Sequence, residues 1–255
     1  MNDRNELASL VADVRASLED AVLRGATDLD RGDELPATTL PEVVPDTSRA
    51  TAWASIAADA RDEAVPAQVA LQRVRDDLGD CRRCGLHSGR RHIVFGVGDP
   101  DADLVICGEG PGYHEDQQGE PFVGPAGEML DKMLVHVLGL QRGQVYILNV
   151  VKCRPPKNRN PLPDEVASCR PFLEAQIAAI QPKLMLVLGG VAFKTLFDTQ
   201  QGITRSRGSW REWRGVPTLP TFHPAYLLRN PAQKRHTFND LKALKVRYDE
   251  LGGGR

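Results

Sequence analysis

The chain has 255 residues, of which 41% are hydrophobic and 26% are charged. These values suit a globular protein with a buried core, and they argue against a largely disordered chain. No apolar run reaches the length of about 18 residues that a membrane-spanning helix needs. The first ten residues show no apolar signal region, so we expect a cytoplasmic protein whose thiols stay reduced.

The net charge of −2 conceals two parts of opposite sign. Residues 1–80 hold 17 Asp/Glu against 8 Lys/Arg, a charge of −9. Residues 81–255 hold 17 Asp/Glu against 24 Lys/Arg, a charge of +7. A basic domain behind an acidic leader suits a polyanionic partner. Ordinary solvated charge with a disordered acidic tail is the alternative.

The first part of the chain is predicted to be helical, with a linker between two helices. Apolar residues recur at helical spacing over residues 5–23 and again near residues 67–79. Between them lie Pro36, Pro41 and Pro45, in a composition typical of a linker. We therefore expect an acidic extension over residues 1–66 and one domain over residues 67–255.

Beyond residue 84, predicted strands alternate with predicted helices. The strands are expected at 103–107, 145–150, 183–188 and 216–222, and the helices at 126–138, 164–180, 191–198 and 237–250. This alternation is typical of βαβ units and predicts an α/β fold with a mainly parallel sheet. Ligands of such sheets bind at the carboxyl ends of the strands.

Four of the five cysteines are candidates for one metal centre. Cys81 and Cys84 form a CxxC pair, Cys153 follows the second predicted strand, and Cys169 lies in the next helix. Four reduced thiols suit zinc or an iron–sulfur cluster, and their spacing does not choose between these. Scattered structural cysteines are the alternative. Cys107 lies in the middle of a strand and is expected in the core.

Three polar side chains follow three different predicted strands. Glu109 lies in a turn rich in glycine, Asn149 ends the second strand, and His223 closes the fourth. The carboxyl ends of parallel strands meet at one edge of a sheet, so these side chains should converge. A phosphate loop fits the first turn poorly, because the Walker lysine is absent and acids such as Glu115 would repel phosphate.

Other residues suggest contact with a nucleic acid. Phe122, in a predicted loop, can stack on a planar base, and the amide of Asn149 can read the edge of a base. The lysines and arginines of residues 152–159 suit a phosphate backbone. A core phenylalanine, and an asparagine that ends its strand by a turn hydrogen bond, are the alternatives.

A second candidate contact lies at Leu227 and Leu228, in a predicted loop beside Arg229. Exposed apolar side chains next to a cation can wedge a base stack while the cation holds a phosphate. The start of a helix with buried leucines is the alternative.

Taken together, these segments resemble the family 4 uracil-DNA glycosylases, the iron–sulfur branch of their superfamily. The similarity covers roughly residues 70–250 and rests on the cysteine spacing and on residues 108–112, 115–116, 121–124, 149–156, 158–159 and 223–230. The resemblance implies a three-layer α/β/α domain around a central, mainly parallel sheet of four strands. The helical or disordered extension before it has no recognised counterpart.

The resemblance also implies roles for individual residues. A [4Fe–4S] cluster would be held by Cys81, Cys84, Cys153 and Cys169. Uracil would be bound by Glu109, Gly110, Pro111, Phe122, Asn149 and His223. The catalytic candidates are His223, Glu109, Glu115 and Asn158. From the side-chain chemistry described above, DNA would be contacted by Lys157, Arg159, Leu227, Leu228 and Arg229. The positions of Cys153 and Cys169 imply that the cluster would brace the basic loop that carries the first two.

The implied activity is removal of uracil from single- or double-stranded DNA, by a monomer associated with the nucleoid. Gly110 stands where the best-known enzymes of the superfamily carry an aspartate, so the water-activating group is open among Glu109, Glu115 and Asn158. A related branch forms a covalent adduct through a histidine in an inserted loop. Residues 157–161 contain neither the inserted loop nor a histidine, which favours ordinary turnover. A non-catalytic iron–sulfur sensor of damage and a zinc-bound nucleic-acid protein are the alternatives.

Overall fold

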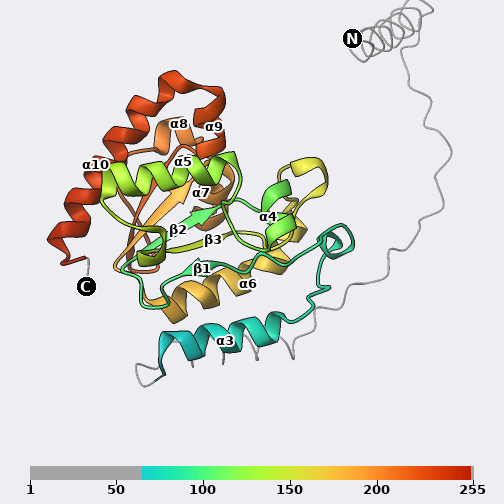
Figure 1. The fold of residues 1–255 in the computed structure, drawn as a ribbon. Coiled ribbons are helices and arrows are strands. Elements are labelled where there is room, and N and C mark those ends of the chain that lie inside the picture. The colour runs from blue at the N-terminus through green and yellow to red at the C-terminus, as the bar shows by residue number, and fades with distance from the viewer. Residues whose placement is uncertain (1–64, 254–255) are drawn as a thin grey trace, which may run out of the picture. The chain divides into compact units, whose positions relative to one another are not determined.

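A computed structural model describes residues 65–253, which all lie in one compact unit (Figure 1). Its centre is a sheet of six strands in the order β1-β3-β2-β4-β6-β5. The four inner strands run parallel and are β3 (Tyr146–Asn149), β2 (Leu104–Gly108), β4 (Leu184–Leu188) and β6 (Val216–Thr221). Their nearly continuous apolar runs are what a sheet covered on both faces requires. The predicted helix at 5–23 and the proline-containing linker lie outside the described residues.

The two edge strands were not predicted. β1 (Val97–Gly98) pairs antiparallel with β3, and β5 (Arg211–Trp213) pairs antiparallel with β6. A strand of two or three residues is too short to show an alternating pattern, so sequence reasoning found only the inner four.

Helices cover both faces of the sheet (Figure 1). The α-helices are α3 (Ala67–Leu78), α4 (Tyr113–Gln118), α5 (Pro125–Met133), α6 (Pro163–Ile180), α7 (Gly190–Phe197), α8 (Ile203–Ser206), α9 (Pro224–Arg229) and α10 (Lys234–Glu250). Shorter turns are η1 (Gly85–Ser88), η2 (Leu134–Leu138, a π-helix), η3 (Arg142–Gln144), η4 (Pro156–Asn158) and η5 (Pro231–Gln233).

The apolar core is divided by the sheet into two clusters. Side chains of α3, α6 and α7 pack with one face of the sheet, and side chains of α5, α9 and α10 pack with the other. Figure 1 shows α5 and α10 on the opposite side of the sheet from α6 and α3. This arrangement confirms the predicted three-layer α/β/α fold.

One element differs in kind from its prediction. Residues 224–229 form the helix α9, where a loop was expected. Pro224 occupies the first helical position, where its missing N–H costs nothing. The preceding His223 caps the helix, because its Nδ1 atom accepts a hydrogen bond from the backbone N–H of Ala225 at 3.2 Å. The catalytic candidate is therefore held by the start of a helix. No helix in residues 65–253 is long and apolar enough to span a membrane.

Candidate active site and cysteine set

A cavity of about 340 Å³ opens at the carboxyl edge of the sheet. Its lining includes ten residues that the sequence singled out: Glu109, Gly110, Pro111, Glu115, Phe122, Asn149, Asn158, Arg159, His223 and Arg229. The predicted convergence of the three polar side chains after β2, β3 and β6 is thus found. Sequence reasoning missed Gly112, Ala126, Pro155, Asn160, Ala225 and Tyr226, which also line the cavity. All six lie within or beside the segments of the resemblance, so their neighbours were the available signal.

His223 is prepared as a neutral hydrogen-bond donor. Its Nδ1 atom accepts from the Ala225 N–H, so the proton of the neutral ring is assigned to Nε2. Burial, assisted by the positive charge of Arg229, lowers the pKa of His223 to about 4, and Glu115 opposes this shift. At neutral pH the cavity therefore contains an uncharged imidazole with an Nε2–H group.

Phe122 lies in the loop between α4 and α5 with a left-handed backbone, at φ 54°. Such a conformation is costly for a bulky residue and needs support from its surroundings. The Phe122 ring stacks on that of His223, with 5.5 Å between the centroids and 28° between the planes. Both stacked rings belong to residues that line the cavity.

The support for this loop comes from Glu115. Its carboxylate accepts hydrogen bonds from three backbone N–H groups: Gly112 at 3.0 Å, Val123 at 3.0 Å and Gly124 at 3.2 Å. The first of these belongs to the start of α4, and the other two directly follow Phe122. The buried carboxylate therefore clamps the phenylalanine loop onto the first turn of α4.

Asn149 ends β3 beside the last residue of β2, Gly108. Its side chain is 2% exposed, and its Oδ1 atom has no hydrogen-bond partner among the described residues. Buried polar atoms are almost always paired, so an unpaired amide oxygen on a residue that lines a cavity indicates a place for a ligand. A Cβ atom on Gly108 would lie 2.6 Å from Cζ of Phe122 and would also collide with Oδ1 of Asn149. Only glycine leaves room for both side chains.

The other two candidates for water activation differ in environment. Glu109 follows β2 and is half-buried, and burial raises the pKa of its carboxyl group. Asn158 is exposed at the mouth of the cavity, and its Oδ1 atom accepts from Nε of Arg154 at 2.7 Å. The carboxyl group of Glu109 is the less solvated of these two.

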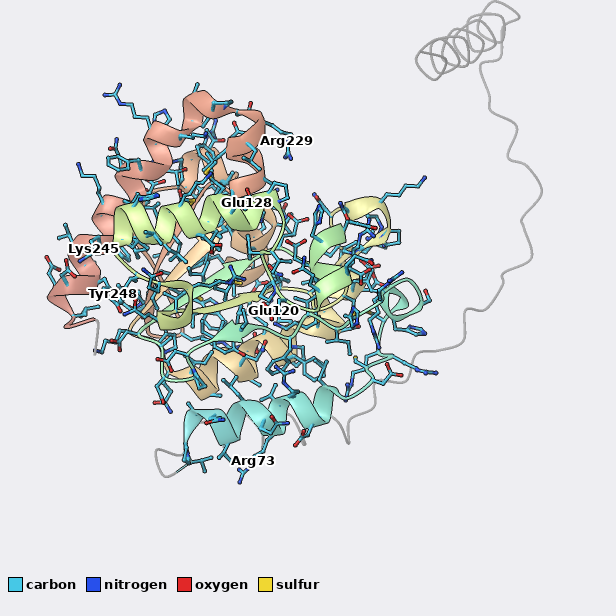
Figure 2. The ribbon with its side chains drawn as sticks, viewed as in Figure 1. Arg73, Glu120, Glu128, Arg229, Lys245 and Tyr248 are labelled. Atoms are coloured by element: carbon cyan, nitrogen blue, oxygen red, sulfur yellow. The ribbon has the colours of Figure 1, made fainter. Side chains whose placement is uncertain are left out.

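The predicted DNA contacts are placed unequally. Lys157 is exposed, and Arg229 is exposed at the end of α9, as labelled in Figure 2. Arg159 lines the cavity, but its guanidinium is held by both carboxylate oxygens of Glu165 at 2.6 and 2.8 Å.

The two leucines of α9 separate. Leu228 is 42% exposed, whereas Leu227 is 1% exposed and packs in the core cluster with α5 and α10. The expectation that Leu227 is exposed in a loop is therefore wrong. Successive residues of a helix point in different directions, so one leucine faces the core and the next faces solvent.

The four candidate metal ligands, here called the cysteine set, come from three segments. Cys81 and Cys84 follow α3, Cys153 lies in the loop after β3, and Cys169 lies in α6; all four are free thiols. Among the described residues no three His, Cys, Asp or Glu side chains are arranged as a metal-holding group. The sulfurs nevertheless influence one another: burial raises the pKa of Cys153, and Cys84 and Cys81 add to the rise. Four soft donors that share one neighbourhood have the chemistry that zinc or an iron–sulfur cluster requires.

Two cations lie against the cysteine set. Arg90 donates from Nη1 to Sγ of Cys153 at 3.4 Å, and the backbone N–H of Lys152 donates to Sγ of Cys169 at 3.3 Å. The Lys152 side chain is 1% exposed, so the interpretation of this lysine as a phosphate contact is wrong. Burial lowers the pKa of Lys152 to about 8. Arg90 had no signal in the sequence, because it lies outside every recognised segment. Cys107 is fully buried in β2, as predicted.

The chain is similar to known proteins over most of the described domain. The model of the uracil DNA glycosylase superfamily matches residues 95–243. A type-4 uracil-DNA glycosylase of Thermotoga maritima is 43% identical over 179 residues, which are 69% of this chain and 93% of the relative. A type-4 uracil-DNA glycosylase of Sulfurisphaera tokodaii is 39% identical over 183 residues, which are 69% of this chain and 83% of the relative. The chain therefore belongs to the uracil-DNA glycosylase superfamily, and within it to the type-4 family.

Proposed function

We propose that this protein is a uracil-DNA glycosylase that releases free uracil from DNA and leaves an abasic site, as in base excision repair. The observation that carries the proposal is the unpaired amide oxygen of Asn149, a residue that lines the cavity. An amide offers one acceptor and one donor side by side. Uracil presents the complementary pair, its N3–H and its O4 atom. In the amide orientation that pairs with uracil, cytosine would place its N3 acceptor against Oδ1 of Asn149 and its amino group against the Nδ2 donor.

The ring of Phe122, which lines the cavity, supports the same ligand. A base can leave the duplex and stack on Phe122, at a cost of a few kcal/mol for unpairing and unstacking. This cost is lowest where uracil is mismatched or already single-stranded, so both forms of DNA are proposed as substrates.

The reaction breaks the bond between C1′ of the sugar and N1 of uracil, and the bonding electrons leave with the base. A water molecule supplies the hydroxyl group to C1′, and the proton that it gives up balances the one that the uracil anion takes up to leave as free uracil. The Nε2–H group of His223 can donate a hydrogen bond to the developing uracil anion. Because this donor is already in place, no solvent has to reorganise around it when the negative charge develops. The carboxylate of Glu115 is already engaged by three N–H groups, so Glu109 and Asn158 are the proposed partners of the water.

Contacts with the rest of the DNA are proposed for exposed residues around the cavity mouth. Lys157 and Arg229 suit phosphates, and Leu228 can fill the gap that a flipped nucleotide leaves in the stack. Arg159 can bind a phosphate only if its guanidinium gives up its ion pair with Glu165.

We propose that the cysteine set holds a [4Fe–4S] cluster. When bound, the cluster supplies four iron–thiolate bonds, which join the segment after α3 to the loop after β3 and to α6. This role is one of bracing the basic loop, and no residue of the cavity needs the cluster for the hydrolysis itself. Purified protein should be brown; colourless protein that contains zinc would contradict the cluster.

The decisive test is release of uracil from DNA that carries U·G, U·A or single-stranded uracil. We expect release by the wild type and a loss of about 10²–10³ in the single-turnover rate for His223→Ala, the size of losing one oxyanion donor. No release from any substrate would instead favour the non-catalytic, damage-sensing alternative. Gel filtration during purification tests the proposed monomer.

A further inference from the structure

Lys152 carries a buried positive charge that the fold alone does not explain. Its ammonium donates to the backbone oxygen of Asn149 at 2.8 Å, and no carboxylate pairs with it in the part of the chain that the structure describes. The titratable groups nearest to it are the buried thiols of Cys169, Cys107 and Cys153. A buried ammonium without an anion costs several kcal/mol, so an anion is expected beside it.

Arg90 follows Cys81 and Cys84 in the chain and reaches across to Cys153. Its Nη1 atom donates to the backbone oxygen of Cys81 at 2.6 Å and to Sγ of Cys153 at 3.4 Å. Its side chain is only 7% exposed, and among residues 65–253 its one ion pair is with the exposed Asp80. The Nη1 end of this guanidinium therefore faces the cysteine set, and the Nη2 end pairs with the Asp80 carboxylate.

Four thiolates bring more negative charge than an iron–sulfide core brings positive charge, so a cluster on the cysteine set is anionic. We propose that Arg90 and Lys152 are the counter-cations of that cluster, and that Lys152 is a positioning residue that joins the cluster to Asn149. The proposal rests on the cluster proposed above. It adds a function for two cations that do not line the cavity.

Lys152 can join the cluster to Asn149 because its backbone N–H and its side-chain ammonium contact different partners. The backbone N–H of Lys152 holds Sγ of Cys169, and its ammonium holds the carbonyl oxygen of Asn149. A change at the cysteine set therefore reaches the strand end that carries the uracil-reading amide. Loss of the ammonium should weaken the binding of uracil-containing DNA more than the chemical step, because Lys152 does not reach the reacting atoms.

The experiment uses the full-length iron-loaded protein and two pairs of variants. Lys152→Met and Arg90→Met remove a charge, whereas Lys152→Arg and Arg90→Lys keep it; Lys132→Met, an exposed position on α5, is the matched control. The measurements are iron and sulfide per chain, the midpoint potential of the cluster, and KM and kcat for uracil release.

A cation near the cluster favours its reduced state, so each Met variant should have a lower midpoint potential than the wild type. The charge-keeping variants should stay near the wild type, and Lys132→Met should not differ from it. KM should rise several-fold in Lys152→Met with little change in kcat. It should not rise in Arg90→Met, because Arg90 has no contact with Asn149.

Unchanged potentials in both Met variants would overturn the proposal. If Lys152→Met loses its cluster altogether, Lys152→Arg decides. A cluster retained by Lys152→Arg would support the proposal for Lys152, and a cluster lost from Lys152→Arg as well would overturn it. The failure of the earlier proposals looks different. If wild-type protein contains no iron, both the cluster and this inference are excluded. If iron-loaded protein releases no uracil, only the proposed glycosylase activity is excluded.

Discussion

His223 is fixed by its neighbours in one protonation state. The Ala225 N–H occupies Nδ1, and burial together with Arg229 disfavours a second ring proton. The ring can therefore donate from Nε2 without first losing a proton at physiological pH. Its chemistry depends on the start of α9 as much as on the histidine itself.

The first prediction concerns pH. The NMR titration of His223 should have its midpoint near pH 4, well below the ordinary value of 6.5. Because the unfolded histidine binds a proton first, the free energy of unfolding should fall as the pH drops from about 6.5 through about 4. The full effect is about 3 kcal/mol, at roughly 1.4 kcal/mol per pH unit. This part of the pH dependence should be missing in His223→Ala; an identical slope in both proteins would contradict the prediction.

The second prediction concerns the space beside Asn149. Gly108→Ala should abolish most uracil release, because the added methyl group displaces both Phe122 and the Asn149 amide. The change should leave the far-ultraviolet circular dichroism unchanged. Gly143→Ala is the matched control, since a Cβ atom there meets nothing within 4 Å. Normal cleavage by Gly108→Ala would show that the cavity does not need this close approach.

At the scale of elements, the site depends on a clamp between α4 and the loop that follows it. The three hydrogen bonds of Glu115 fix the ends of that loop, and Phe122 lies in a strained backbone conformation within it. A clamp of this kind determines where the stacking ring stands before any ligand arrives.

The third prediction is that Glu115→Ala lowers single-turnover cleavage without abolishing DNA binding. The released loop would let Phe122 leave its left-handed conformation, whereas Lys157 and Arg229 would still contact phosphates. Glu115→Gln keeps an acceptor oxygen for Val123 and Gly124 and should lie between the wild type and Glu115→Ala. Unchanged cleavage by Glu115→Ala would remove the clamp from the account.

Sequence reasoning placed the cavity well because of a property of parallel sheets. Glu109, Asn149 and His223 each follow a buried apolar run, and such ends meet at one edge. It failed where the burial of a residue depends on its direction around a helix, or where a contact joins residues distant in sequence. Nothing in the local sequence shows that Leu227 is buried and Leu228 is exposed. Arg90 meets Cys153, 63 residues later in the chain, only through folding.

At the scale of the whole molecule, the cysteine set spans parts that the sheet does not connect. α3 packs on α6 outside the sheet, and the segment after it carries Cys81 and Cys84. A cluster would close this part of the domain onto the loop that ends at the cavity, and metal binding of this kind adds directly to folding energy.

The fourth prediction is that Cys153→Ser lowers both the iron content and the thermal midpoint of unfolding. Each kcal/mol lost should lower Tm by about 2–4 °C in a domain of this size. Cys107→Ser is a comparison that changes a buried core thiol outside the cysteine set, so it should destabilise the protein while the iron stays bound. Equal iron content in wild type and Cys153→Ser would exclude Cys153 as a ligand.

The six-stranded sheet ends in strands of only two and three residues, β1 and β5. Long unpaired edges invite further strands from other molecules, and short ones offer few free N–H and C=O groups. β5 also presents the exposed charges of Arg211 and Glu212 at its edge. The folded domain should therefore resist fibril formation and edge-to-edge aggregation when it is concentrated, although its inner strands are almost wholly apolar.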